Sequence, residues 1–141
     1  MKRYMAALAL TLSAAAVQAQ PVFSGTDYSG IYDCTGVDAH EGAYTGIVTM
    51  TLDPDQSEGA HGAYRFKLEV PGFGTYLGQA VSHGASIAMY FALTDQSAGD
   101  YGTGLAIVEK SEDGRVRFHK FYYEPEYAGG NHGTEDCLSR N

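Results

Sequence analysis

The sequence has few positive charges and no tryptophan. Its 141 residues include 9 lysines and arginines against 17 aspartates and glutamates, which gives a formal net charge of −8. That charge repels phosphate groups and anionic membranes, so the composition argues against nucleic acid and lipid surfaces as partners. Apolar residues make up 44% of the chain and aromatic residues 12%, more than intrinsically disordered segments contain. We therefore expect a folded, acidic protein.

The sequence also lacks an apolar run long enough to cross a membrane. Its Ala-rich run, residues 5–17, is thirteen residues long, whereas a membrane-spanning helix needs about twenty. The run follows the basic pair Lys2-Arg3 and precedes the small-residue motif Val17-Gln18-Ala19, which is the pattern of a secretory signal peptide. We predict that residues 1–19 are a signal peptide and that residues 20–141 form one periplasmic or secreted domain without membrane insertion. Cleavage would leave 7 basic and 17 acidic residues, a net charge of −10.

Cysteine is scarce as well, and the two that are present are Cys34 and Cys137. In an exported protein an even pair of cysteines predicts a disulfide bond, with two buried free thiols as the alternative. The pair has no C-x-x-C spacing, so we predict no metal site. The bond would close a loop of about a hundred residues, for which the chain-entropy model gives roughly 4.7 kcal/mol. It would also join the first structured segment to the last, so the two ends of the sheet would meet.

Helical periodicity is nearly absent after the predicted signal, and short runs of alternating apolar and polar residues take its place. In the clearest run, Tyr64, Phe66 and Leu68 alternate with Arg65 and Lys67. The alternation and the intervening turn residues predict eight strands, over Gly30–Val37, Gly42–Leu52, Ala63–Val70, Thr75–Ser82, Ser86–Thr94, Tyr101–Lys110, Arg115–Tyr123 and Thr134–Leu138.

Eight short strands with regular spacing and tight turns predict an all-β domain. The fold class we expect is a closed eight-stranded antiparallel up-and-down barrel, with a β-sandwich as the alternative. The 18 glycines, many of them near a tyrosine, favour the barrel because glycine permits sharp bends that a neighbouring aromatic ring can cover. This architecture resembles that of the calycins, and the chain length is nearest that of the avidin-type barrels. The absence of tryptophan excludes the tryptophan-lined biotin cage and the lipocalin G-x-W signature, so the resemblance implies architecture alone.

The segment Ser86–Thr94 is apolar on both faces of its predicted strand. A strand that is covered on both sides indicates a subunit interface or a packed loop. We therefore expect that the protein could form a homo-oligomer through Ser86–Thr94.

Tyrosine is the most frequent aromatic residue, with 11 copies, and it suggests the first functional hypothesis. Tyrosine rings stack on planar or apolar molecules while their hydroxyl groups orient them. We predict a binding module that holds a small, partly apolar molecule in a barrel cavity of a few hundred cubic ångströms. The expected ligand-binding residues are Tyr44, Tyr64, Tyr76, Tyr90 and, at the mouth of the barrel, Tyr122. No cofactor is predicted.

A second hypothesis is a protein-binding module, such as an inhibitor of an exported hydrolase. The negative charge would attract a basic partner, and three acidic loops would make the contact: Asp53–Glu58, Asp95–Asp100 and Glu124–Glu126.

A third hypothesis is an enzyme with a histidine and carboxylate site at one rim of the barrel. The candidate residues are His40, Glu41, Asn131, His132 and Glu135, which together could bind a metal or exchange protons. If Cys34 lies opposite Cys137, alternation places His40 and His132 on different faces of the sheet. The sequence has no G-x-S-x-G, H-E-x-x-H or P-loop motif. We therefore name no catalytic residue and take the site to be a polar rim.

Overall fold

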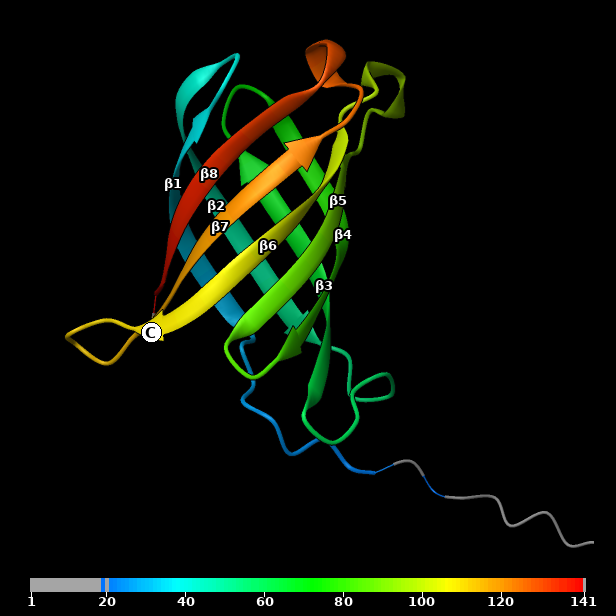
Figure 1. Cartoon of the computed structure of the whole chain (residues 1–141), viewed down its shortest axis with the longest axis vertical. Coiled ribbons are helices and arrows are strands. Elements are labelled where there is room, and N and C mark those ends of the chain that lie inside the picture. Colours follow the sequence, from blue (N-terminus) through cyan, green and yellow to red (C-terminus); the bar gives the residue numbers. More distant parts are fainter. Residues whose placement is uncertain (1–18, 20, 141) are drawn as a thin grey trace, which may run out of the picture.

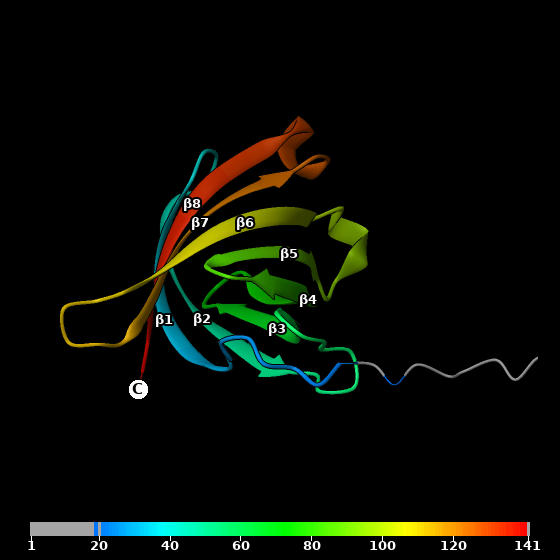
Figure 2. The ribbon, with the colours of Figure 1, turned by 60° about the horizontal axis from the view of Figure 1, so that its bottom comes forward.

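Eight consecutive strands, each hydrogen-bonded to the next and the last to the first, form a closed antiparallel barrel. The computed structural model describes Ala19 and residues 21–140, so the predicted signal peptide falls almost entirely outside the described residues. Figure 1 shows the barrel, and in Figure 2 β1 and β8 lie side by side where it closes. The strands are β1 (Gly30–Asp38), β2 (Gly42–Leu52), β3 (His61–Val70), β4 (Gly74–His83), β5 (Ser86–Leu93), β6 (Tyr101–Lys110), β7 (Val116–Glu124) and β8 (Asn131–Ser139).

The predicted barrel is confirmed, and the alternative sandwich is wrong. Seven predicted strands agree with the observed ones to within two residues at either end, whereas β8 begins at Asn131, three residues before the predicted start. Two single-turn 3-10 helices complete the structure, η1 (Gln96–Ala98) and η2 (Tyr127–Gly129). Within the described part of the chain, no helix has the length and apolar character needed to span a membrane.

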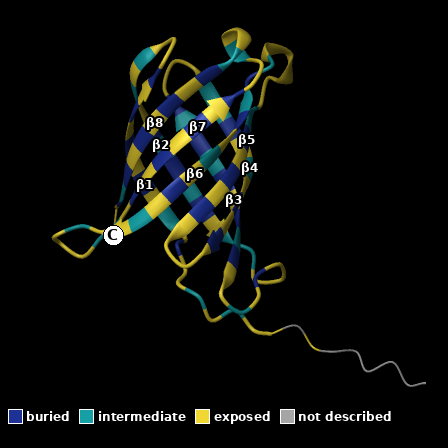
Figure 3. Ribbon diagram, viewed as in Figure 1, coloured by how far each residue is buried: buried dark blue, intermediate teal, exposed yellow. Residues whose placement is uncertain are grey.

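Side chains along every strand alternate between the interior and the outer surface, as the checkered burial pattern in Figure 3 shows. On β3, Tyr64, Phe66 and Leu68 are buried inside the barrel, while Arg65 is exposed outside. The interior of an eight-stranded barrel is just wide enough for side chains to fill. The inward side chains therefore build one continuous core, to which β8 contributes the buried polar residues Asn131 and Glu135.

The barrel closes where β1 pairs with β8, and the predicted disulfide bond lies in this pair. Cys34 and Cys137 are directly opposite each other, their Sγ atoms are 2.02 Å apart, and both side chains are buried. The same register places Asp38 opposite Gly133. The two terminal strands of the sheet are thus joined by backbone hydrogen bonds and by one covalent link.

The segment before β1 closes one end of the barrel, at the bottom in Figure 1. The Tyr28 hydroxyl donates to the Gly84 carbonyl at 2.8 Å, and the Tyr32 hydroxyl donates to the Tyr28 carbonyl at 2.7 Å. The Tyr64 hydroxyl accepts a hydrogen bond of 3.1 Å from the Tyr28 N–H. These hydrogen bonds attach the N-terminal segment across the bottom end of the barrel, which the chain itself therefore closes.

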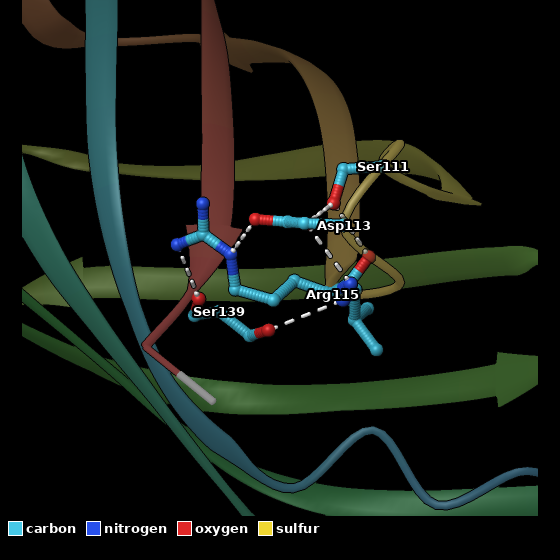
Figure 4. Close-up of polar contacts among 5 residues, drawn as sticks. Ser111, Asp113, Arg115 and Ser139 are labelled. Carbon is cyan, nitrogen blue, oxygen red and sulfur yellow. Dashed lines mark hydrogen bonds and ion pairs between the residues drawn. The ribbon is translucent and has the colours of Figure 1, made fainter.

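The hairpin between β6 and β7 is attached to the end of β8 by polar contacts (Figure 4). Arg115 donates from Nε to Asp113 at 2.6 Å and from its guanidinium to the Ser139 carbonyl at 3.4 Å. The Ser139 hydroxyl accepts from the Val116 N–H at 3.1 Å. These bonds hold the end of β8 beside β7 at the same end of the barrel that the N-terminal segment closes.

Replacement of both cysteines, Cys34→Ala with Cys137→Ala, should lower the free energy of unfolding by roughly 2–5 kcal/mol. The reason is that the bond restricts the unfolded chain over a sequence separation of 103 residues. Urea unfolding with and without reductant measures the effect: reductant should lower the wild-type midpoint toward that of the variant and leave the variant unchanged. Equal midpoints for both proteins without reductant would contradict this expectation.

Candidate functional site

The end of the barrel opposite the N-terminal segment holds a cavity, which we call the mouth site. It lies at the top in Figure 1, among the loops 39–41, 71–73, 94–100 and 125–130. Its volume is about 50 Å³, room for a few waters. Its aromatic lining residues are Tyr44, Phe73, Tyr76, Phe91, Tyr122 and Tyr127.

The mouth site is far smaller than the predicted cavity of a few hundred cubic ångströms, and that prediction is wrong. Large side chains fill the middle of the barrel, because Met50, Phe66, Ile87 and Phe118 all point inward and are almost fully buried. A ligand of ordinary size can therefore enter only in part, with the remainder at the open rim.

The floor of the mouth site is a buried ion pair between Lys120 on β7 and Glu135 on β8. The Lys120 Nζ lies 2.7 Å from Glu135 Oε1, and both side chains are at most 1% exposed. The same nitrogen lies 5.4–5.6 Å from the ring centroids of Phe66, Phe91 and Tyr122, within the range of cation–π attraction. Glu135 was predicted at the rim. The structure corrects this, because Glu135 is an inward residue two positions from the Cys137 disulfide.

Two glycines give room to the tyrosines of the mouth site. Gly36 on β1 pairs with Tyr44, and Gly133 on β8 pairs with Tyr122. A Cβ atom on either glycine would overlap the ring of its tyrosine partner. The rings therefore lie over bare backbone, and the Tyr44 hydroxyl donates to Glu135 Oε2 at 2.8 Å. Burial raises the pKa of Tyr44, and the negative charge of Glu135 raises it further.

Asp38, at the end of β1, is a fully hydrogen-bonded carboxylate. Its Oδ2 accepts from the Tyr122 hydroxyl at 2.8 Å and from Asn131 Nδ2 at 2.7 Å. Its Oδ1 accepts from the N–H groups of His40 and Glu41 at 2.8 and 2.9 Å. Burial by itself would raise the pKa of Asp38, but these four hydrogen bonds outweigh burial and lower the pKa below its ordinary value. Asp38 is therefore ionised at neutral pH.

Glu124 and Asp100 are buried carboxyl groups with fewer donors. Glu124 Oε2 accepts from Asn131 Nδ2 at 2.5 Å, and Asp100 Oδ2 accepts from the Tyr76 hydroxyl at 2.7 Å. Burial raises the pKa of Glu124 to about 7, the Asn131 hydrogen bond opposes this, and the charges of Asp100 and Asp38 add to it. Glu124 thus changes its charge near neutral pH.

The predicted ligand-binding tyrosines fall in three places. Tyr44, Tyr76 and Tyr122 line the mouth site. Tyr64 lies at the closed end, where it contacts Tyr28. Tyr90 is on the outer surface and 49% exposed, so its predicted place in the cavity is wrong. Since Ile87, Met89 and Phe91 face inward on β5, alternation directs Tyr90 outward.

The predicted rim residues are not brought together into one site. His40 is exposed in the first loop, with Nε2 3.3 Å from the Gly130 carbonyl, and His132 is exposed on the outer face of β8. Glu41 Oε1 accepts from the Tyr127 hydroxyl at 2.7 Å, and Asn131 points into the barrel. Among the described residues, neither histidine belongs to a set of three ligating side chains that lie close together.

Few groups in the described residues could hold a metal ion. The single set of three ligating side chains found close together is Cys34, Cys137 and Glu135, in which both cysteines belong to the disulfide bond. A disulfide offers no thiolate ligand, so this set does not fit a metal.

The acidic loops proposed for protein binding are not all at one end of the barrel. Asp53–Glu58 lies at the closed end, and the other two loops lie at the mouth.

Sequence reasoning missed Lys120 and underrated Asp100. Lys120 stands between Phe118 and Tyr122 at an inward position of β7, so strict alternation would have placed it in the barrel. Asp100 precedes β6 and follows a turn, where no periodicity indicates the direction of a side chain.

Comparison with known proteins found no family model, no curated protein and no solved structure that matches this chain. The mouth site itself therefore has to indicate what the protein does.

The substitution Glu124→Gln should stabilise the protein increasingly as the pH rises. The folded-state pKa of about 7 exceeds the ordinary 4.5, so the destabilisation that comes from burying this carboxyl group is absent below pH 4.5, grows as the pH rises from 4.5 to 7 and is constant above that range. Glutamine removes this cost, still accepts from Asn131 and can donate to Asp100. Urea unfolding at several values between pH 5 and 8 measures the difference, with the exposed Glu112→Gln as control. The prediction is contradicted by a difference that does not change with pH.

Proposed function

We propose that this protein is a binding module that takes a small, partly apolar ligand at the mouth site. The observation that carries the proposal is a cavity with tyrosine and phenylalanine walls at the one end of the barrel that the N-terminal segment leaves open. Aromatic walls with a few buried polar groups are typical of small-molecule sites. The 50 Å³ volume indicates that the ligand inserts one end and leaves the rest at the rim, against the half-exposed Phe73.

We prefer this hypothesis to an enzyme or a hydrolase inhibitor because of where the candidate residues of each hypothesis lie. The two rim histidines belong to no close group of three ligating side chains in the described residues, and one of the three acidic loops lies at the end of the barrel opposite the other two, so neither alternative has all of its predicted residues in one place. The buried disulfide, for its part, supports export to an oxidising compartment, in agreement with the predicted signal peptide.

Fragment titration followed by NMR tests the proposed function. Neutral and charged compounds of about six to ten non-hydrogen atoms should shift the amide resonances of Asp38, Tyr76 and Tyr122 before those of Tyr28 or Tyr64 at the closed end. The reason is that the mouth site is the accessible cavity at the open end of the barrel. A Val70→Trp variant, which places a large ring in the wall of the mouth site, should abolish these shifts. Binding that persists in this variant, or shifts spread over the outer surface, would show the proposal to be wrong.

We also propose that two copies of the chain associate through the outer surface of β4–β7. Large apolar side chains of the described residues gather there, and the charged Glu109 and Arg117 of this surface pair with each other. The apolar side chains are Leu77, Val81, Tyr90, Leu105, Ile107, Phe121 and Tyr123, each 42–56% exposed. They are contiguous, because Val81 pairs with Ala88, Ala88 with Leu105 and Leu105 with Phe121. Apolar patches of this kind mark interfaces.

A second copy is the partner that this surface fits. Each chain carries a net charge of −8, so two copies repel least across a surface whose large exposed side chains are apolar and whose charged pair, Glu109 with Arg117, is neutral overall. The predicted interface strand, Ser86–Thr94, corresponds to β5 in the middle of the surface, with the small residues Ala88 and Ala92 beside larger neighbours.

Native mass spectrometry and sedimentation test the self-association. The wild-type protein should be a dimer at micromolar concentration, and Leu105→Lys should yield monomers because it places two like charges in an apolar interface. Ile31→Lys is a matched control, since Ile31 is 44% exposed on the outer face of β1, outside the proposed interface. A monomeric wild-type protein would refute the proposed dimer.

A further inference from the structure

The interior of the barrel holds more negative than positive charge. Among the described residues, the buried charged side chains are four carboxylates and one amine, namely Asp38, Asp100, Glu124, Glu135 and Lys120. Lys120 is paired with Glu135 at 2.7 Å, which leaves the other three carboxyl groups at the mouth without a buried cation. Buried charge without a counter-charge is costly, so such groups bind a proton or a cation.

Asp100 has a buried oxygen to which no group donates a hydrogen bond. The residue is only 7% exposed and lines the mouth site. Its Oδ2 accepts from Tyr76, but its Oδ1 is buried and has no hydrogen-bond partner. Buried acceptors without a partner are rare in folded proteins and are often explained by a missing water or ligand. Asn131 Oδ1 is also unpartnered, but Asn131 does not line the cavity.

The surroundings of Asp100 favour an organic cation over a metal ion. The mouth carboxylates do not converge as a group of three ligands, whereas Ca²⁺ and Mg²⁺ need several oxygen ligands around one point. The rings of Phe91, Tyr76 and Tyr122 form the walls instead. Aromatic faces attract ammonium groups and also cover apolar carbon atoms.

We propose that the ligand of the mouth site is a small organic amine, whose ammonium group lies between Asp100 and Glu124 and whose apolar part lies against Phe73 at the rim. This inference rests on the proposed function and adds the charge of the ligand to it. Asp38 contributes its fixed negative charge from the opposite side of Asn131.

The amine and a proton compete for the same place. The groups that face Glu124 are Asp38 on β1, Tyr76 on β4, Asp100 before β6, Tyr122 on β7 and Asn131 on β8, and none of them is a cation. Protonated Glu124 can donate to Asp100, whereas an ammonium group favours the ionised carboxylate. Amine binding should therefore strengthen as the pH rises through about 7 and should release a proton to solvent near that pH.

Three probes with the same apolar chain test the charge of the ligand: hexylamine, hexan-1-ol and hexanoate. Calorimetry and NMR titration at pH 7.5 should show hexylamine binding at the mouth at least about tenfold more tightly than hexan-1-ol, because hydrogen bonds to charged groups are the stronger kind. Hexanoate should bind most weakly. Hexylamine affinity should rise between pH 6 and 8 in the wild-type protein.

Variants assign the effect to particular carboxyl groups. Asp100→Asn and Glu124→Gln should each reduce hexylamine affinity about tenfold, a larger loss than either variant causes for hexan-1-ol, and Glu124→Gln should also remove the pH dependence. Glu112→Gln is the control, because it removes the same charge from the exposed hairpin at the closed end. The comparison of probes on wild-type protein does not depend on whether any variant folds.

The outcomes separate this inference from the proposed function. If hexan-1-ol or hexanoate binds at the mouth as tightly as hexylamine, the ligand is not selected for positive charge. The present inference is then wrong and the binding function stands. If no probe shifts the mouth resonances at millimolar concentration, both are wrong. If Glu112→Gln loses as much hexylamine affinity as the Asp100 and Glu124 variants, the loss comes from the net charge of the protein. The assignment to Asp100 and Glu124 is then wrong.

Discussion

Burial of charge in a narrow barrel is the constraint from which the properties of this protein follow. Eight strands enclose just enough space for side chains, and five ionisable groups occupy part of it. Lys120 and Glu135 neutralise each other at the floor of the mouth site, where three aromatic rings surround the ammonium group. Asp38 is stabilised by four hydrogen bonds. Asp100 and Glu124 each accept one hydrogen bond, and these two buried carboxyl groups distinguish the open end from the closed end.

The two ends of the barrel differ because the chain itself fills one of them. At the closed end, the hydroxyl groups of Tyr28, Tyr32 and Tyr64 bind backbone groups of the N-terminal segment and its neighbours. At the open end, the hydroxyls of Tyr76 and Tyr122 bind carboxylates instead. The same residue type therefore closes one end with neutral hydrogen bonds and lines a charged cavity at the other. The disulfide bond joins β1, which carries Asp38, to β8, which carries Asn131 and Glu135.

Much of the fold was predictable from the alternation of apolar and polar residues. This pattern indicates where the strands lie and which of their side chains point into the barrel. The pairing of Cys34 with Cys137 was enough to infer the register of the closing strands. The site was predictable only in part. Tyr90 was misplaced because β5 is apolar on both faces, so hydrophobicity could not tell inside from outside. Lys120 was overlooked because charge suggests exposure, and Asp100 lies in a connection where alternation no longer applies.

The mouth site carries buried carboxylates, and a proton on Glu124 partly neutralises them. An NMR titration of the side-chain carboxyl carbons, followed from pH 4 to 9, tests it most directly. We expect Glu124 to titrate near pH 7, whereas Asp38 should be ionised at neutral pH because its pKa is lowered below the ordinary value. A Glu124 midpoint near the ordinary 4.5 would contradict this, because it would mean that Glu124 is solvated like an exposed carboxylate.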